Sequence, residues 1–270
     1  MSDFLSKKEK KISYEYEKRG YLVKDIEDTD SLSKIRKIFI QSIKKNIKAK
    51  SYFEKDEDIL NFIHKKINPN KLNNFRLKII NEINENNELR KLYYNVARSY
   101  LDILIGNELA MQLRINLSIQ LPNDKSSLLP LHSDVWSGDS PYEMVVWLPL
   151  VDCYKTKAMY ILPPTKYKKL KKIFLDKTTT SSEKIFKKIK KDLKWIEIKY
   201  GQVLLFNQCL PHGNITNKEK ETRWSLNCRF KGVFTPYNDK KIGEFFEPIT
   251  LRKISKLGMR YNLPKLNEKS

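Results

Sequence analysis

The sequence has few of the residues that build metal centres or covalent cross-links, since only three cysteines and three histidines occur among 270 residues. Cys153, Cys209 and Cys228 lack the paired spacing of zinc or redox motifs, so we expect a reducing, cytoplasmic compartment. The longest apolar run, residues 145–151, contains a proline and is too short to span a membrane. Residues 1–11 are charged and do not resemble a secretory leader.

Acidic residues are scarce relative to basic ones, which leaves a net charge of +21. Such an excess can attract nucleic acid or an anionic surface. Lysine, however, greatly outnumbers arginine, and the basic residues are not interleaved with aromatic residues as they are in nucleic-acid-binding modules. The sequence therefore does not favour a nucleic-acid partner, and it leaves the oligomeric state open.

Apolar periodicity divides the chain into a helical first part and a strand-rich second part. Helical spacing predicts helices over residues 1–19, 30–47, 59–67 and 88–105, with a short entry strand at 21–26. From Leu109 the period changes from 3.6 to 2, which indicates strands. We predict one domain overall, mainly β with a helical layer (α+β). It divides into an N-terminal layer with the entry strand (1–108), a β core (109–235) and a C-terminal covering segment (236–270).

Residues 111–120 alternate between polar and apolar side chains. The polar row consists of Gln112, Arg114, Asn116, Ser118 and Gln120. In a strand these side chains share one face. That face either meets solvent or lines a polar pocket, and the sequence leaves both possibilities open.

His132 and Asp134 are candidate metal ligands. If this segment is extended, residues two apart point the same way, which places an imidazole beside a carboxylate. His212 can supply a third ligand from a neighbouring strand. Two histidines and one carboxylate on one face of a metal form the arrangement of non-haem Fe(II) oxygenases. His-x-Asp also occurs often without a metal, and the third histidine, His64, lies in a lysine-flanked helical segment and is not a predicted ligand.

Arg223 is a candidate for binding an organic anion near this site. It follows His212 by eleven residues, and a hairpin of that length would return it close to the metal. Arginine binds a carboxylate through two parallel hydrogen bonds. Ser225 shares the same strand face and can donate another bond. Arg229 also lies on this face, and spacing alone does not decide between the two arginines.

The series His132-x-Asp134, then His212, then Arg223 resembles the phytanoyl-CoA dioxygenase-like branch of the Fe(II)/2-oxoglutarate oxygenases. Three further stretches carry the likeness: residues 145–152, which include Trp147, residues 159–166 and residues 201–206. Pro164, Thr165 and Gln202 depart from the usual residues. The likeness covers residues 109–235 and the entry strand, and it is closest to members associated with bacterial carbohydrate gene clusters.

The resemblance implies a double-stranded β-helix core, a jelly roll of the cupin type, with helices packed on it. It also implies that His132, Asp134 and His212 hold Fe(II), and that 2-oxoglutarate and O2 are co-substrates. Arg223 would then pair with the distal carboxylate of 2-oxoglutarate. The further candidates for the cofactor pocket are Ser225, Gln112, Asn116 and Trp147. The expected reaction is hydroxylation of a small polar substrate, such as a sugar or sugar-derived metabolite, coupled to decarboxylation of 2-oxoglutarate to succinate.

Other functions are compatible with the same fold. One is a non-catalytic jelly-roll protein that binds carbohydrate or acts as a scaffold, and another is a metal-dependent epimerase.

Residues 166–194 contain twelve lysines. This Lys-rich insertion, residues 165–195, is either a solvated surface or an electropositive lid that attracts a polar or anionic substrate. The sequence does not choose between these alternatives or identify the substrate.

Overall fold

The computed structural model describes residues 4–47, 53, 55–175 and 181–262. Its strands are β1 (Tyr21–Asp25), β2 (Leu109–Gln112), β3 (Asn116–Gln120), β4 (Glu143–Pro149), β5 (Met159–Ile161), β6 (Lys194–Ile196), β7 (Gln202–Asn207), β8 (His212–Gly213), β9 (Arg223–Gly232) and β10 (Phe246–Pro248). Among the described residues, the larger sheet has the order β1-β7-β4-β9-β2-β10, with β3 also paired to β9, and the smaller has the order β6-β5-β8. All of these pairings are antiparallel.

The two sheets pack on each other through an apolar cluster. Val145 and Phe206 from the larger sheet meet Met159 and Ile161 from the smaller sheet in this cluster. Apolar side chains on the facing sides of two sheets leave water together, which is the main force that holds such layers. The predicted jelly-roll core with a helical layer is confirmed.

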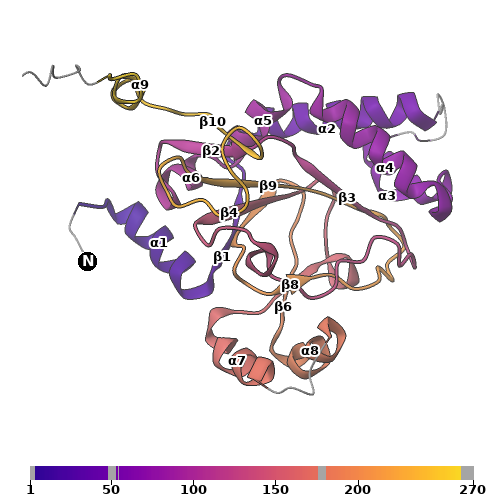
Figure 1. Ribbon diagram of the computed structural model, residues 1–270. Coiled ribbons are helices and arrows are strands. Elements are labelled where there is room, and N and C mark those ends of the chain that lie inside the picture. The colour runs from indigo at the N-terminus through magenta and orange to yellow at the C-terminus, as the bar shows by residue number, and fades with distance from the viewer. Residues whose placement is uncertain (1–3, 48–52, 54, 176–180, 263–270) are drawn as a thin grey trace, which may run out of the picture.

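Helices cover the outer face of the larger sheet, on the side opposite α7 and α8 (Figure 1). Helices α1 (Lys7–Arg19), α2 (Thr29–Ile47), α3 (Asp56–Phe62), α4 (Pro69–Asn84), α5 (Leu89–Asn95) and α6 (Arg98–Leu104) belong to this layer. The described helices elsewhere are α7 (Tyr167–Leu175), α8 (Ser182–Ile189) and α9 (Lys253–Met259). Two buried polar groups tie this layer to the sheet. Tyr93 Oη donates to the carbonyl of Val146 at 2.8 Å, and Trp224 Nε1 donates to the carbonyl of Leu60 at 2.9 Å.

Strand β9 separates the apolar core from the polar interior of the jelly roll. Its outer row, Trp224, Leu226, Cys228 and Phe230, is fully buried against the helical layer. Its inner row, Arg223, Ser225, Asn227 and Arg229, points between the sheets, because strand side chains alternate. The shared face that the sequence predicted for Arg223, Ser225 and Arg229 is therefore confirmed.

Three elements differ from the sequence-based expectation. The helix predicted over residues 88–105 is broken into α5 and α6, and Ala97 at the break has non-helical angles (φ −125°, ψ 0°). The strand predicted over 111–120 is divided into β2 and β3. Helix α4, which the sequence analysis did not predict, begins at Pro69 just after the helix predicted over 59–67, because the Asn68 side chain caps it and a proline fits its first turn.

The Lys-rich insertion forms α7 and α8 on the smaller sheet. Their apolar side chains, among them Leu170 and Ile185, pack on Leu131 and Tyr160.

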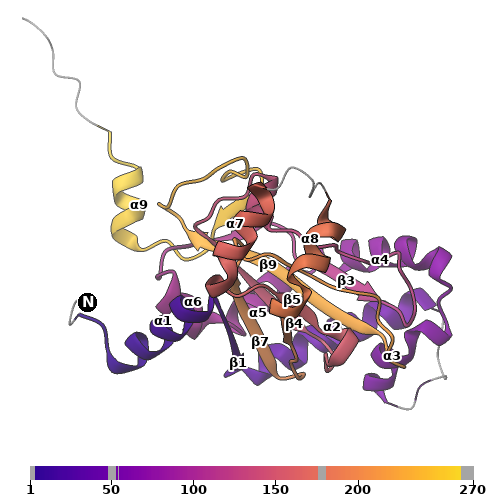
Figure 2. The same cartoon turned by 90° about the horizontal axis from the view of Figure 1, so that it is seen from below.

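The C-terminal segment returns to the larger sheet through β10, which pairs with β2. It then continues into α9, which projects away from the body (Figure 2). None of the described helices is long and apolar enough to cross a membrane.

Candidate metal centre and anion site

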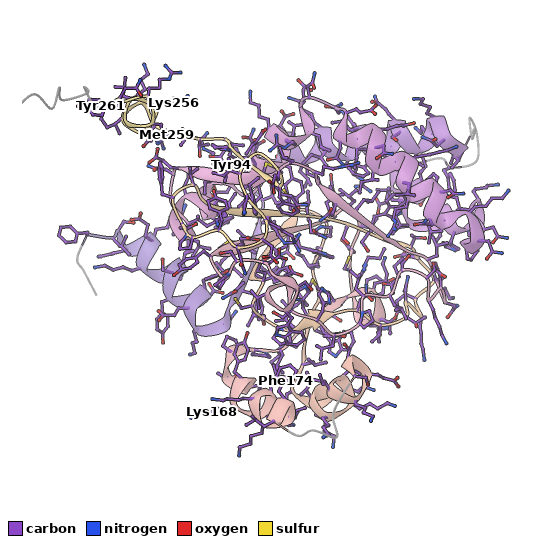
Figure 3. The ribbon with its side chains drawn as sticks, in the orientation of Figure 1. Tyr94, Lys168, Phe174, Lys256, Met259 and Tyr261 are labelled. Carbon is purple, nitrogen blue, oxygen red and sulfur yellow. The ribbon has the colours of Figure 1, made fainter. Side chains whose placement is uncertain are left out.

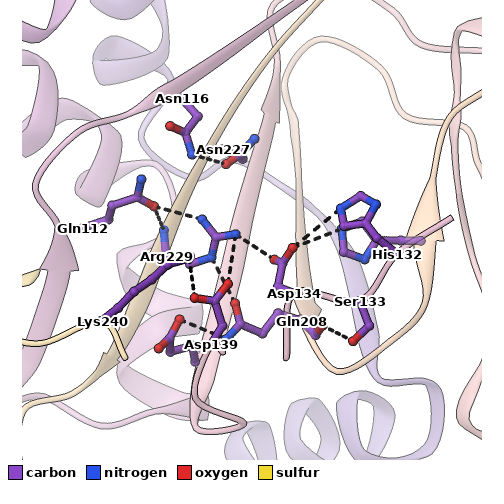
Figure 4. Close-up of polar contacts among 12 residues, drawn as sticks. Gln112, Asn116, His132, Ser133, Asp134, Asp139, Gln208, Asn227, Arg229 and Lys240 are labelled. Atoms are coloured by element: carbon purple, nitrogen blue, oxygen red, sulfur yellow. Dashed lines mark hydrogen bonds and ion pairs between the residues drawn. The ribbon is translucent and has the colours of Figure 1, made fainter. Parts of the chain in front are cut away.

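His132, Asp134 and His212 line one cavity between the sheets. Figure 4 shows His132 beside Asp134. The two histidines face each other across an antiparallel bridge, in which each backbone N–H donates to the other's carbonyl at 3.0 and 2.8 Å. Their Nε2 atoms lie 3.6 and 3.9 Å from Oδ1 of Asp134. Ligand atoms of all three residues lie within 4.8 Å of one another. The structure thus brings together the three residues that the sequence selected.

Asp134 is not positioned by a strand. The expectation that residues 132–134 are extended was therefore wrong at Asp134, the last of the three. Asp134 begins a short 3-10 helix that runs to Ser137. A loop anchors it, because its N–H donates to the carbonyl of Gln208 at 3.2 Å. Ser133 Oγ donates to the same carbonyl at 3.0 Å and to that of Cys209 at 3.1 Å. These bonds, rather than strand alternation, aim the carboxylate at the histidines.

Both histidines present a free Nε2 to the centre. Nδ1 of His132 lies 2.7 Å from the carbonyl oxygen of Pro130, and Nδ1 of His212 lies 2.8 Å from that of Leu210. A carbonyl only accepts, so Nδ1 of each ring donates to it, and a neutral ring in this orientation has its lone pair on Nε2, towards the centre. Burial, together with the nearby His132, lowers the pKa of His212 to about 4, which leaves it neutral at pH 7.

This donor set fits a first-row divalent metal. Two imidazoles and one carboxylate, with their remaining polar atoms bonded to the protein, are the ligands and support that such metals use. Bond lengths of about 2.1 Å place adjacent ligand atoms about 3 Å apart. The observed separations of 3.6 and 3.9 Å therefore need only small side-chain adjustments.

Arg223 has no charged partner among the residues that the structure describes, although it is only 2% exposed. Its Nη2 donates to Ser118 Oγ at 3.1 Å, while its Nε has no hydrogen-bond partner. The hydroxyl of Ser225, also buried, has no partner either. No described carboxylate forms an ion pair with Arg223, and burial lowers its pKa from the usual arginine value. A buried cation beside an unpaired hydroxyl is a site that an anionic ligand would complete.

Arg229, the alternative arginine, already has its partners. Its Nη2 lies 2.9 Å from Oδ2 of Asp134, and its Nε donates to Gln208 Oε1 at 3.0 Å. Its Nη1 and its backbone N–H both reach Gln112 Oε1, at 3.4 and 3.2 Å. A ligand carboxylate would have to displace these bonds. The geometry therefore favours Arg223 over Arg229 as the anion-binding arginine.

The other predicted pocket residues separate into two groups. Asn116 and Trp147 line the cavity, which has a volume of about 230 Å³, and Asn116 Nδ2 donates to Asn227 Oδ1 at 3.0 Å. Gln112 and Ser225 are not among the residues that line this cavity; Gln112 lies behind Arg229, and Ser225 follows Arg223 on the same face of β9. Ser118 lines the cavity as well, so part of the polar row at residues 112–120 faces a pocket rather than solvent.

Arg223 does not reach the cavity through a hairpin, contrary to the sequence-based expectation. His212 lies in β8 of the smaller sheet, whereas Arg223 begins β9 of the larger sheet. Residues 214–222 therefore cross from one sheet to the other. This crossover places the two residues on opposite walls of one cavity, because facing sheets enclose the space between them.

Sequence analysis missed several supporting residues. Asp139 lies 3.5 Å from Arg229 Nη2 and also pairs with Lys240, and Gln208 donates from Nε2 to Glu143 Oε2 at 2.9 Å. These residues come from loops or strand ends without a recognisable pattern. Burial raises the pKa of Glu143, although the bond from Gln208 opposes the shift. Among the supporting residues, only Asn227 could have been predicted from the sequence, because it belongs to the polar inner row of β9.

Neither a protein-family profile nor a curated protein matches the sequence. Solved structures do match the fold. The nickel complex of the non-haem monooxygenase ThoJ aligns with a TM-score of 0.57 and 11% identity, over 89% of this chain and 84% of that chain. The α-ketoglutarate-dependent epimerase SnoN from nogalamycin biosynthesis aligns with a TM-score of 0.53 and 12% identity, over 91% of this chain and 93% of that chain. EctD from S. alaskensis aligns with a TM-score of 0.54 and 14% identity, over 88% of this chain and 81% of that chain. The chain therefore has the fold of non-haem, 2-oxoglutarate-dependent enzymes, as its sequence predicted.

Proposed function

We propose that this protein is an Fe(II)- and 2-oxoglutarate-dependent dioxygenase that hydroxylates a small polar substrate. The observation that carries the proposal is the pairing of two incomplete sites in one cavity. A His-Asp-His cluster lies among its walls, and the buried Arg223, which lacks an anionic partner, lies in the same lining. A dicarboxylate that chelates a metal with one end and meets an arginine with the other would complete both.

In this proposal each group of residues has a defined task. His132, Asp134 and His212 hold iron, and Arg223 with Ser225 binds the distal carboxylate of 2-oxoglutarate. Iron with 2-oxoglutarate bound supplies the activation of O2 for oxidation of a C–H bond. Apolar walls that include Trp147 limit the access of water, which strengthens charge–charge contacts in the cavity.

A second candidate function is epimerisation on the same scaffold. SnoN, which shares the fold, is an epimerase and has been solved with Fe3+, α-ketoglutarate and nogalamycin RO. The two reactions differ in their products. Hydroxylation leaves an oxygen atom from O2 in the product, whereas epimerisation inverts a carbon centre without adding oxygen. Heavy-isotope dioxygen therefore separates them. A non-catalytic carbohydrate-binding protein would form no succinate.

We propose that the primary substrate is polar or anionic, such as a sugar derivative, and lies beside the Lys-rich insertion. Helix α7 borders the metal centre, because Phe174 stacks edge-on against Trp136, two residues after Asp134, with ring centroids 5.2 Å apart. Tyr167 also donates to the carbonyl of Cys209 in the loop behind Asp134. Figure 3 shows Lys168 and Phe174 on this helix. A positive rim raises the local concentration of anions.

The decisive experiment is an anaerobic titration of the protein with Fe(II) and then 2-oxoglutarate. A visible charge-transfer band, followed by O2-dependent formation of succinate, is the expected result. Arg223→Leu should shift the 2-oxoglutarate titration to much higher concentration. Arg114→Leu, which changes an exposed arginine outside the cavity, is the matched control and should leave the titration unchanged. Absence of both the band and succinate from the wild-type protein would refute the assignment.

A further inference from the structure

Helix α9 is attached to the body but does not pack on it. It has no buried residue, and Ile254, Leu257 and Tyr261 are 76%, 65% and 66% exposed. Figures 2 and 3 show the helix standing away from the domain, and Figure 3 labels Lys256, Met259 and Tyr261. Its start is fixed, since the backbone N–H of Arg252 donates to Glu108 Oε1 at 2.9 Å. A segment with so much exposed apolar surface suggests a binding surface.

Ile254 and Leu257, at the spacing i, i+3, form an apolar stripe on the helix, and Tyr261 follows at i+7 just past the C-cap Arg260. Met259, also exposed, lies on another side of the helix. Lys253, Lys256 and Arg260 follow the same spacing one residue earlier, so they form a parallel basic stripe. The turn continues past Met259, because the N–H of Tyr261 donates to the carbonyl of Gly258 at 3.1 Å. The segment is therefore amphipathic, with a cationic flank.

The basic stripe is not neutralised by the protein. Within the described part of the chain, the side chains of Lys253, Lys256 and Arg260 form no ion pair or hydrogen bond. Helix α1 lies at the same end of the molecule in Figures 1 and 2. That helix and the residues before it also expose aromatic and basic side chains, including Phe4 at 95%, Tyr14 at 60% and Lys11. Two cationic, partly apolar elements thus face outward at one end.

We propose that α9 docks the protein onto an anionic lipid surface, with its apolar stripe in the headgroup boundary and its basic stripe on the lipid phosphates. An interfacial helix needs both features: apolar side chains to insert and lysine or arginine to meet negative headgroups. A nucleic acid would neutralise the charges but leave the apolar stripe in water. Association through so short a helix is reversible and salt-sensitive. The inference is independent of the proposed oxygenase function.

The test is co-flotation of the full chain with vesicles of phosphatidylcholine alone or mixed with phosphatidylserine. Three variants are compared. Lys253→Gln/Lys256→Gln/Arg260→Gln removes the basic stripe, and Ile254→Ser/Leu257→Ser removes apolar side chains without changing charge. Lys168→Gln/Lys171→Gln/Lys172→Gln on α7 is the control, because it makes the same change in net charge elsewhere. Since α9 has no buried residue, the α9 variants should retain the wild-type circular dichroism spectrum and melting temperature.

Wild-type protein should bind the phosphatidylserine vesicles and not the neutral ones. The basic-stripe variant should bind about a hundredfold more weakly, because each cation near an anionic surface contributes several-fold to affinity. The serine variant should also lose binding, while the α7 control should retain most of it. Equal losses in the α7 control and the basic-stripe variant would overturn the proposal. So would α9-dependent binding to a soluble polyanion such as polyglutamate without binding to vesicles.

Discussion

Nη2 of Arg229 lies 2.9 Å from Oδ2 of Asp134, the carboxylate whose other oxygen faces His132 and His212. One oxygen is thereby held by the protein and the other is left for the centre. Gln112 and Gln208 hold the guanidinium in turn. Such supporting bonds fix the orientation of a metal-binding side chain before the metal arrives.

We predict that Arg229→Gln weakens Fe(II) binding by about ten- to a hundredfold, because Asp134 loses the bond that orients it. Anaerobic Fe(II) titration measures this change. Arg223→Leu serves as the comparison and should leave Fe(II) affinity unaltered, since Arg223 makes no bond to the three candidate ligands. An unchanged Fe(II) affinity in Arg229→Gln would show that the ion pair is dispensable for the metal.

Arg223→Leu should instead weaken the binding of 2-oxoglutarate. Loss of a buried, charge-assisted pair costs about 2–5 kcal/mol, which corresponds to at least about thirtyfold in affinity. The charge-transfer band, titrated with 2-oxoglutarate at saturating Fe(II), reports this directly. If Arg229→Gln shows the larger loss of 2-oxoglutarate affinity and Arg223→Leu shows none, the assignment of the two arginines is reversed.

Asp134→Ala should abolish succinate formation while the protein remains folded. The variant removes one candidate ligand, but Arg229 retains Asp139 at 3.5 Å as a counter-charge, so no isolated cation is left in the interior. Succinate assays and circular dichroism measure the two outcomes separately. Wild-type rates of 2-oxoglutarate decarboxylation in this variant would rule out Asp134 as a ligand.

An ion pair outside the cavity lining, with its lysine fully buried, should control acid stability. Lys157 is fully buried, and its Nζ lies 2.8 Å from Glu221 Oε2. Burial raises the pKa of Glu221, but the bonds from Lys157 and Tyr154 outweigh it and lower the pKa below the usual value of 4.5. The ionised Glu221 carboxylate therefore stabilises the fold above about pH 4.5, its usual pKa. This contribution is lost as the pH falls through the lowered pKa of the folded state.

Glu221→Gln should accordingly reduce the free energy of unfolding by about 2–3 kcal/mol at pH 7, because Lys157 loses its counter-charge. Urea denaturation at neutral and acidic pH measures the difference, which should shrink at acidic pH. Glu183→Gln, in an exposed pair with Lys187 on α8, is the control and should produce no measurable change. A pH-independent difference between wild type and Glu221→Gln would contradict the ionic explanation.

Neutralising Lys168, Lys171 and Lys172 on α7 should lower kcat/KM for an anionic primary substrate and flatten its salt dependence. These lysines form no ion pair with other described residues, whereas Lys169 pairs with Asp192. Screening by salt removes long-range attraction, so the effect should be largest at low ionic strength. Uncoupled decarboxylation of 2-oxoglutarate should barely change. Unaltered kinetics at low salt would identify these lysines as a solvated surface.

The sequence by itself determined the local features of this protein. Alternation along residues 223–230 defined which side chains face the helical layer and which face the cavity, because strand side chains alternate strictly. The spacing of His132 and Asp134 suggested a ligand pair, and the family resemblance, together with His212, selected the three residues that converge. The resemblance to the Fe(II)/2-oxoglutarate oxygenases supplied the jelly-roll topology, which periodicity does not encode.

Spacing alone did not separate Arg223 from Arg229, and the resemblance implied Arg223. Only the tertiary structure showed how their surroundings differ, because both arginines share one strand face and their partners come from distant segments. Arg229 bonds to Asp134, Gln112 and Gln208, whereas Arg223, among the described residues, has a hydrogen bond only to the hydroxyl of Ser118. Satisfaction of a buried charge depends on contacts between residues far apart in the chain, and no local pattern records those contacts.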